Sequence, residues 1–367
     1  MLNDRNMGPI AKTVCLLAML IALLPAKAWA ADEIEAARYL SFKPPGAAGV
    51  LHYYVSLTPG ADTGSLPTSA LIAIHGHPRD ANKTFEAAMT AARRANRLND
   101  MLIVAPVFQV PTAESQKCRT KGVPPAQEGD LVWTCASWIE GGVASNDNQF
   151  GSFDALDALV VELIRQWPSL RRITVAGFSA GAQMVQHYIG FADDDAHVTL
   201  RYVVADPGSW LYFDRERPTP VQENEPADWS VCTASNAAAC AFRFRAESSV
   251  CTELNEWKYG TDAMPAYLKR SAEQARLHYA RAKIHYLEGA LDTGEGKGTF
   301  YRILDKSCAA EAQGPYRLQR GLAYAAYDRA KLAPDKARYV TLIPDCAHDV
   351  ACVLPSEAAR AALFGDP

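Results

Sequence analysis

The 367-residue sequence lacks any local cluster of lysine and arginine, and its formal charge at pH 7 is only −4. Proteins that bind nucleic acid neutralise phosphates with a basic surface, so this absence argues against a nucleic-acid partner. No Cys-x-x-Cys pair occurs, which argues against a zinc ribbon or a thioredoxin-like redox site. Internal repeats and low-complexity tracts are also absent. What remains is an ordinary globular composition, with 49% hydrophobic and 21% charged residues.

Long apolar runs are scarce too, and the one that occurs lies near the N-terminus, at residues 13–26. It follows two basic residues and precedes Ala28-Trp29-Ala30, a pattern typical of a secretory signal peptide. The run is too short to span a bilayer, and Cys15 lies at its beginning, which argues against a lipoprotein anchor. We therefore expect residues 1–30 to be a signal peptide and residues 31–367 to be secreted or periplasmic, with no membrane span. The oligomeric state stays open.

The cysteines fit this expectation. Of the 9 cysteines, Cys15 falls in the expected signal peptide, so 8 remain, and an even count in an exported chain indicates disulfides. The candidates are Cys118, Cys135, Cys232, Cys240, Cys251, Cys308, Cys346 and Cys352. Cys118 with Cys135 and Cys346 with Cys352 would close short loops. Cys308 would pair with whichever of the other three is left over, so the connectivity stays open.

Apolar runs alternate with helical patterns along most of the chain. Strands are expected at 52–57, 70–74, 101–106, 173–176, 201–205, 283–287 and 339–343. Helices are expected at 85–98, 153–167, 271–282 and 317–332, and a short polar helix pattern followed by a loop or edge element occupies 31–47. Continuous apolar strands alternating with helices predict an α/β fold with a doubly wound, mostly parallel sheet.

Residues 177–181 spell Gly-Phe-Ser-Ala-Gly, between a β-branched run and a helical pattern. In this context Ser179 would occupy a sharp strand-to-helix turn with its hydroxyl exposed. Gly177 and Gly181 would leave room for the tight crossing of strand and helix. Ser179 is therefore a candidate nucleophile, and an ordinary turn serine is the alternative interpretation.

With this motif and its surroundings, the sequence resembles the α/β-hydrolase superfamily over most of residues 31–367. Members of that superfamily carry nucleophile, acid and histidine in this order, each on a loop after a strand. The resemblance implies Ser179 as nucleophile, Asp292 as acid and His348 as base. Asp206, directly after the 201–205 strand, is the alternative acid, because some members place their acid there.

The resemblance also implies an oxyanion hole made by two backbone N–H groups. One belongs to Ala180, directly after the nucleophile, and the other to His77 in the loop that follows the 70–74 strand. His75 and His77 without a carboxylate cluster are a poor metal pair, so we expect neither a metal nor a cofactor.

Two further expectations concern the surroundings of the site. Residues 207–265 would form a small cap-like insertion in the domain. Trp133, Trp138 and Trp210 lie on loops that would border the site in this fold, where they would contact substrate.

These residues predict an exported serine hydrolase that cleaves a carboxylic ester, of a small molecule or of a polymer, through an acyl-enzyme. A peptidase or a polyester depolymerase of the same fold would use the same machinery. A non-catalytic binding protein that keeps the fold is the alternative from a different class.

Overall fold

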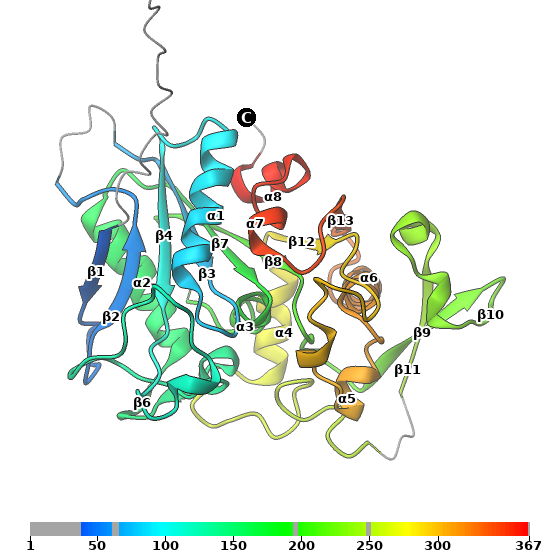
Figure 1. Ribbon diagram of the computed structural model, residues 1–367. Helices are drawn as coiled ribbons and strands as arrows, with labels where there is room; N and C mark the ends of the chain where they lie inside the picture. The colour runs from blue at the N-terminus through cyan, green and yellow to red at the C-terminus, as the bar shows by residue number, and fades with distance from the viewer. Residues whose placement is uncertain (1–37, 61–65, 194–196, 247–250, 366–367) are drawn as a thin grey trace, which may run out of the picture. The chain divides into compact units, whose positions relative to one another are not determined.

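A central sheet of eight strands organises the computed structural model, which describes residues 38–60, 66–193, 197–246 and 251–365. Across the sheet the strands are β1 (Arg38–Phe42), β2 (Leu51–Val55), β4 (Met101–Val107), β3 (Ser69–Ile74), β7 (Arg172–Phe178), β8 (Thr199–Ala205), β12 (Ile284–Gly289) and β13 (Val340–Ile343) (Figure 1). β2 runs antiparallel to both neighbours, and every pairing from β4 to β13 is parallel. This confirms the predicted α/β fold with a mostly parallel sheet.

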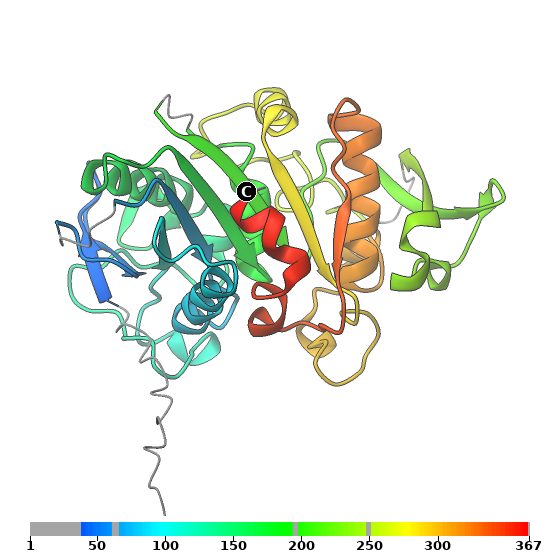
Figure 2. The same ribbon diagram turned by 90° about the horizontal axis from the view of Figure 1, so that it is seen from above.

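Helices cover both faces of the sheet. One face carries α1 (Ala81–Arg94), α7 (Val350–Val353) and α8 (Arg360–Phe364), which pack into one apolar core (Figure 2). The other face carries α2 (Ser152–Gln166), α3 (Ala180–Tyr188), α4 (Ala272–Arg281) and α6 (Arg317–Tyr327), which supply residues to a second core. Strand β3 shows why two cores form. Ile72 and Ile74 point into the second core, whereas Leu71 points into the first, because successive side chains of a strand face opposite sides.

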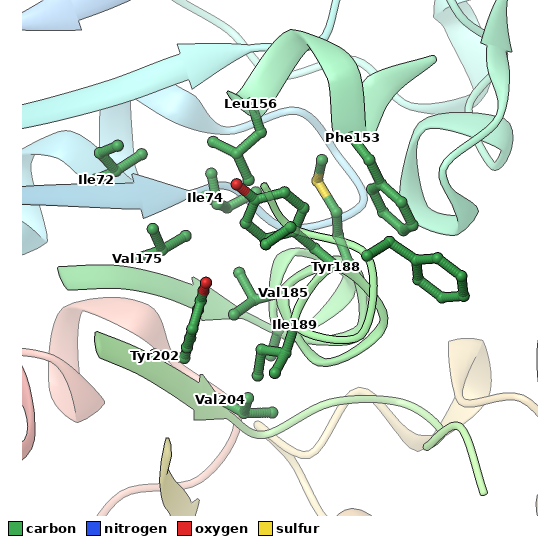
Figure 3. Packing of buried hydrophobic residues seen from close by; sticks show 14 of the residues in the cluster. Ile72, Ile74, Phe153, Leu156, Val175, Val185, Tyr188, Ile189, Tyr202 and Val204 are labelled. Atoms are coloured by element: carbon green, nitrogen blue, oxygen red, sulfur yellow. The ribbon is translucent and has the colours of Figure 1, made fainter. Parts of the chain in front are cut away.

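The second core supports the turn that carries Ser179. Figure 3 shows Val185 and Tyr188 of α3 against Val175 of β7 and Leu156 of α2. Helix α3 is therefore fixed to the strand that precedes it, and the turn that joins β7 to α3 starts from a rigid base.

Shorter elements fill the long connections. They are η1 (Ser115–Lys117), η2 (Ser137–Glu140), β5 (Val143–Ala144), β6 (Asp147–Gly151), η3 (Trp229–Val231), η4 (Ala234–Ala239), η5 (Tyr301–Ile303), α5 (Cys308–Glu311), the π-helical turn η6 (Asp328–Leu332) and η7 (Glu357–Ala359). Within 207–265, the expected cap-like insertion, β9 (Glu216–Gln222), β10 (Glu225–Pro226) and β11 (Ala241–Ala246) form an antiparallel sheet of their own in the order β10-β9-β11.

The helical part of the prediction for residues 31–47 is wrong over the residues that the structure describes. Residues 38–42 are strand β1 and not a helix. β1 pairs with β2 along its whole length, and Tyr39 stacks on His52 at 4.9 Å. Pairing with a neighbouring strand outweighs a weak helical pattern here. The expected signal peptide, 1–30, lies outside the described residues.

Four disulfides join the eight cysteines: Cys118–Cys135, Cys232–Cys240, Cys251–Cys308 and Cys346–Cys352. Cys251 is thus the partner of Cys308 that the sequence left open. Disulfides persist in oxidising compartments, so the four pairs fit a secreted or periplasmic protein. Across the described ranges, no helix has both the length and the apolar character that a membrane crossing requires.

Candidate active site

Ser179 lies on the turn between β7 and α3, with backbone angles of φ 58° and ψ −121°. Such angles are costly for a residue with a side chain, and they persist where the surroundings impose them. The Ser179 N–H donates to the Ala205 oxygen at 3.0 Å, which fixes the turn to β8. A Cβ atom on Gly177 would overlap the backbone of Gly181, and one on Gly181 would overlap the backbone oxygens of Ile74 and His75, so neither position has room for a side chain where strand and helix cross. The turn therefore presents the Ser179 side chain at the carboxyl end of the sheet.

His348 joins Ser179 to Asp292 through its two ring nitrogens. Its Nε2 lies 2.8 Å from Ser179 Oγ, and its Nδ1 lies 2.7 Å from Asp292 Oδ2. Asp292 follows β12 and His348 follows β13, so parallel strands bring three distant segments to one edge of the sheet. A carboxylate at Nδ1 favours the tautomer that carries its proton there, which leaves the Nε2 lone pair facing the hydroxyl.

Asp292 is buried, with 1% of its side chain exposed, and its oxygens have defined partners. Oδ2 accepts from His348, and Oδ1 accepts from Arg317 Nη1 at 3.2 Å. The same Arg317 nitrogen donates to the Thr299 oxygen at 2.7 Å. The imidazole and the guanidinium therefore hold both carboxyl oxygens of Asp292 in place.

The electrostatics of His348 keep the imidazole neutral and ready to accept a proton. Burial lowers its pKa below the ordinary value, the hydrogen bond that His348 donates to Asp292 offsets part of that shift, and the charge of Arg317 lowers the pKa further. The ring stacks on Phe178 with centroids 4.7 Å apart, which holds its plane.

Asp206, the alternative acid, lies at the end of β8 and is fully buried. Its Oδ1 accepts from the Gly289 N–H at 2.7 Å, and its other carboxylate oxygen faces the Glu288 side chain. Burial, together with the nearby charge of Asp292, raises the pKa of Asp206 to about 8. Burial and the charge of Asp206 raise the pKa of Glu288 as well. Two buried carboxyl groups side by side resist being ionised together, so these raised pKa values favour a pair that retains a shared proton.

Asp206, Asp292 and His348 also resemble a metal site in their spacing. Atoms of Asp206, Asp292 and His348 lie within 4.8 Å of one another, which is close enough to coordinate an ion. However, His348 already bonds Ser179, and the guanidinium of Arg317 lies 3.2 Å from Asp292 and would repel a cation. Hydrogen bonding accounts for the arrangement better than metal ligation.

The loop after β3 carries His77, the expected second oxyanion donor. The loop is braced by Asp80, whose Oδ1 accepts from the Gly76 N–H at 3.0 Å, and by buried Arg79, which donates to Gln109 at 2.7 Å. The His77 N–H donates to no acceptor within the described part of the chain. Ala180 begins α3, and the first N–H groups of a helix have no acceptor inside it.

A cavity of about 520 Å³ opens at Ser179 and His348. Its lining comes from the His77 loop, from Phe178 and Ser179, from residues 298–303 and from residues 345–352. Among the described residues, none from 207–265 lines it, so the expected cap supplies no wall here.

The three candidate tryptophans lie elsewhere, and this corrects the expectation that they contact substrate. Trp133, Trp138 and Trp210 are each 0% exposed and belong to the large apolar core. Trp138 stacks on Phe108 at 5.3 Å and Trp210 stacks on Tyr324 at 4.4 Å. Large rings on long connections bury more apolar area by covering the core than by lining a wet cavity.

Three residues near the site were missed by the sequence analysis. Arg317 and Glu288 lie in a helix and a strand whose patterns give no hint of a buried charge. Phe300 lines the cavity from a loop without periodicity, although the Gly-rich stretch around it marks a tight turn.

No protein-family model matches this sequence, and no curated protein matches it. Among solved structures, the chain is similar to poly(aspartic acid) hydrolase-1 from Sphingomonas sp. KT-1, at 18% identity and a TM-score of 0.57, covering 90% of this chain and 98% of that one. It is also similar to a poly(3-hydroxybutyrate) depolymerase from Bordetella parapertussis, at 16% identity and a TM-score of 0.54, covering 89% of each chain. At these identities the likeness shows the fold alone. Together with the strand order of the sheet, it shows that the chain has an α/β-hydrolase fold.

Proposed function

We propose that this protein is an exported serine hydrolase that cleaves a carboxylic ester through an acyl-enzyme. Ser179 is the nucleophile, His348 the general base and acid, and Asp292 the acid that orients the imidazole. The observation that carries the proposal is the continuous chain of hydrogen bonds from Ser179 Oγ through His348 to Asp292, beside an open cavity. The two similar structures are hydrolases by name, which supports the same reaction class.

Acylation follows from this geometry. His348 Nε2 takes the Ser179 hydroxyl proton while Oγ bonds to the carbonyl carbon of the ester, and the carbonyl oxygen becomes an oxyanion. The N–H groups of Ala180 and His77 stabilise that oxyanion. When the tetrahedral intermediate collapses, the carbon–oxygen bond to the alcohol breaks, and the alcohol oxygen takes the proton from Nε2. Water then repeats the sequence on the acyl-enzyme and releases the carboxylic acid.

Asp292 stays ionised throughout and stabilises the imidazolium that forms twice per cycle. Arg317 holds this carboxylate on the side away from His348, so that Oδ2 faces Nδ1. Export is part of the proposal, on the basis of the predicted signal peptide and the four disulfides.

Turnover of p-nitrophenyl esters tests this function. We expect the wild type to hydrolyse p-nitrophenyl acetate, and Ser179→Ala to lose at least about a thousandfold in kcat. Ser235→Ala, in the separate segment η4, is the matched control and keeps full activity. A fluorophosphonate probe should label Ser179 and no other serine. Equal turnover by wild type and Ser179→Ala would end the proposal, and a wild type inactive on all acyl lengths would favour a binding protein.

A further inference from the structure

Two large apolar side chains stand exposed at the cavity that holds Ser179 and His348. Phe300 is 58% exposed and Ile303 is 66% exposed, and both line that cavity. The Phe300 ring faces the His348 ring edge-on, with centroids 6.2 Å apart. Exposed apolar groups that gather at a cleft usually mark a surface that a ligand covers.

The loop that carries these side chains is held in place by the same groups that hold the proposed triad. The His348 N–H donates to the Gly298 oxygen at 3.1 Å, and Arg317 donates to the Thr299 oxygen at 2.7 Å. Below them, Asp305 accepts from the Tyr259 hydroxyl at 2.6 Å and pairs with Lys258 at 3.2 Å. The backbone next to Thr299 is therefore fixed relative to the reacting hydroxyl.

Phe300 itself has a backbone φ of 47°, in the left-handed region that a bulky residue rarely adopts. The fold thus accepts two unfavourable features at one position, a strained backbone and an aromatic ring in water. Such features cluster at ligand-binding sites, where contact with the ligand compensates them.

The charged side chains that line the cavity restrict which substrates it can bind. Among the described residues that line it, the charged side chains are the carboxylates of Asp80, Asp345 and Asp349 and the ammonium of Lys83. Asp80 also accepts from the Gly76 N–H and Asp349 from the Ala351 N–H, so the positions of both carboxylates are fixed. An excess of negative charge repels an anionic substrate and leaves an uncharged one unaffected.

We propose that Phe300 and Ile303 form the acyl-binding wall of the site, and that the substrate is an uncharged ester with an extended apolar acyl chain. This rests on the proposed function and names its substrate class. Each methylene that the wall removes from water should improve kcat/KM by roughly fourfold, until the chain extends past Ile303.

A series of p-nitrophenyl esters tests the proposal, from acetate through butyrate and hexanoate to octanoate. The anionic hemisuccinate ester is compared with butyrate, because the two acyl chains are of similar length. We expect wild-type kcat/KM to rise by about tenfold or more from acetate to hexanoate. We expect the hemisuccinate to react about tenfold more slowly than butyrate, or worse.

The variants Phe300→Ala, Ile303→Ala and the double variant should flatten the chain-length profile, with the loss in KM rather than in kcat. Both side chains are exposed, so the melting temperature should stay at the wild-type value. Leu277→Ala is the matched control, because Leu277 is a large apolar residue, 43% exposed, on helix α4 and outside the cavity lining. It should keep the wild-type profile.

The possible outcomes separate the two proposals. A wild type that hydrolyses acetate but shows no preference for longer chains overturns the acyl-binding wall and leaves the proposed function intact. A double variant that keeps the wild-type preference for longer acyl chains also overturns the acyl-binding wall and leaves the proposed function intact. Equal rates on hemisuccinate and butyrate have the same consequence. A wild type inactive on every ester overturns both.

Discussion

Two carboxyl groups, Asp206 and Asp292, end neighbouring parallel strands of the sheet, and either position suits the acid of a serine hydrolase. Both are buried, at 0% and 1% exposure, and each lies within 4.8 Å of His348 in at least one oxygen. Burial and strand position therefore do not distinguish them. What differs is the set of groups that each carboxyl faces.

Asp292 faces an imidazole and a guanidinium, whereas Asp206 faces a backbone N–H and another carboxyl. The first set consists of hydrogen-bond donors on both carboxyl oxygens, and one of these donors is the His348 ring itself. The second set favours a protonated group, and Glu288 supplies the partner that shares the proton. In the proposed mechanism the carboxyl of Asp292 orients the base, whereas the carboxyl of Asp206 is a structural clamp. The clamp holds Gly289, three residues before Asp292, so the two regions are mechanically connected.

The largest expected effect separates the two positions by activity. Asp292→Asn should lower kcat on p-nitrophenyl acetate by about ten-thousandfold, because the amide favours the wrong tautomer of His348 and cannot stabilise the imidazolium. Asp206→Asn should cost less than about tenfold, since the amide oxygen still accepts from the Gly289 N–H and the amide nitrogen can donate to Glu288. Steady-state kinetics on both variants, with circular dichroism to confirm folding, measures the difference. A wild-type-like Asp292→Asn enzyme, or an inactive but folded Asp206→Asn enzyme, would transfer the role of acid to Asp206.

Much of the fold could be predicted from the sequence, because local patterns of apolar residues indicate most of its strands and helices. The continuous apolar run at 70–74 is a strand buried on both faces of the sheet, and the β-branched and aromatic stretches at 201–205 and 283–287 also fall in strands. The Gly-x-Ser-x-Gly turn was found for the same reason, since it combines a strand, a tight crossing and a helix in one stretch.

The partners of buried charges could not be predicted, because they come from distant segments. Nothing near Glu288 in the sequence indicates that Asp206 faces it, and Arg317 approaches Asp292 only because α6 packs beside β12. The tryptophans were misplaced for a related reason. A loop position suggested access to substrate, but the segments that hold Trp133 and Trp210 fold inward and use the rings as core.

A smaller effect concerns the space that the Asp206–Glu288 pair occupies. A Cβ atom on Gly321 of α6 would lie 2.0 Å from Glu288 Oε1, so Gly321→Ala must displace the buried carboxyl. We expect a loss of about 1–3 kcal/mol in the free energy of unfolding, from urea denaturation. Helix propensity alone predicts the opposite sign, a gain of roughly 0.5–1 kcal/mol from Gly to Ala.

Two controls sharpen this prediction. Gly296→Ala should be nearly neutral, since a Cβ atom there meets nothing within 4 Å. In a Glu288→Ala background, the cost of Gly321→Ala should shrink or vanish, because the clashing carboxyl is gone. A Gly321→Ala protein more stable than the wild type would show that Glu288 does not fill this space.

The smallest expected effect is the dependence of stability on pH, which tests the shared proton directly. The pKa of Asp206 is raised by burial to about 8, and burial raises the pKa of Glu288 too, whereas both groups titrate near their ordinary values in the unfolded chain. The folded state therefore holds a proton that the unfolded state has released. Stability is thus greatest towards pH 5 and falls as pH rises through about 8.

The double variant Asp206→Asn, Glu288→Gln has no such proton. Between about pH 5 and about pH 9, its melting temperature should fall by at least about 4 °C less than that of the wild type. Because His348 and the other histidines are the same in both proteins, they cancel in the difference. Parallel melting curves for the two proteins would mean that Asp206 is ionised in the fold, and the contrast with Asp292 would then lie in geometry alone.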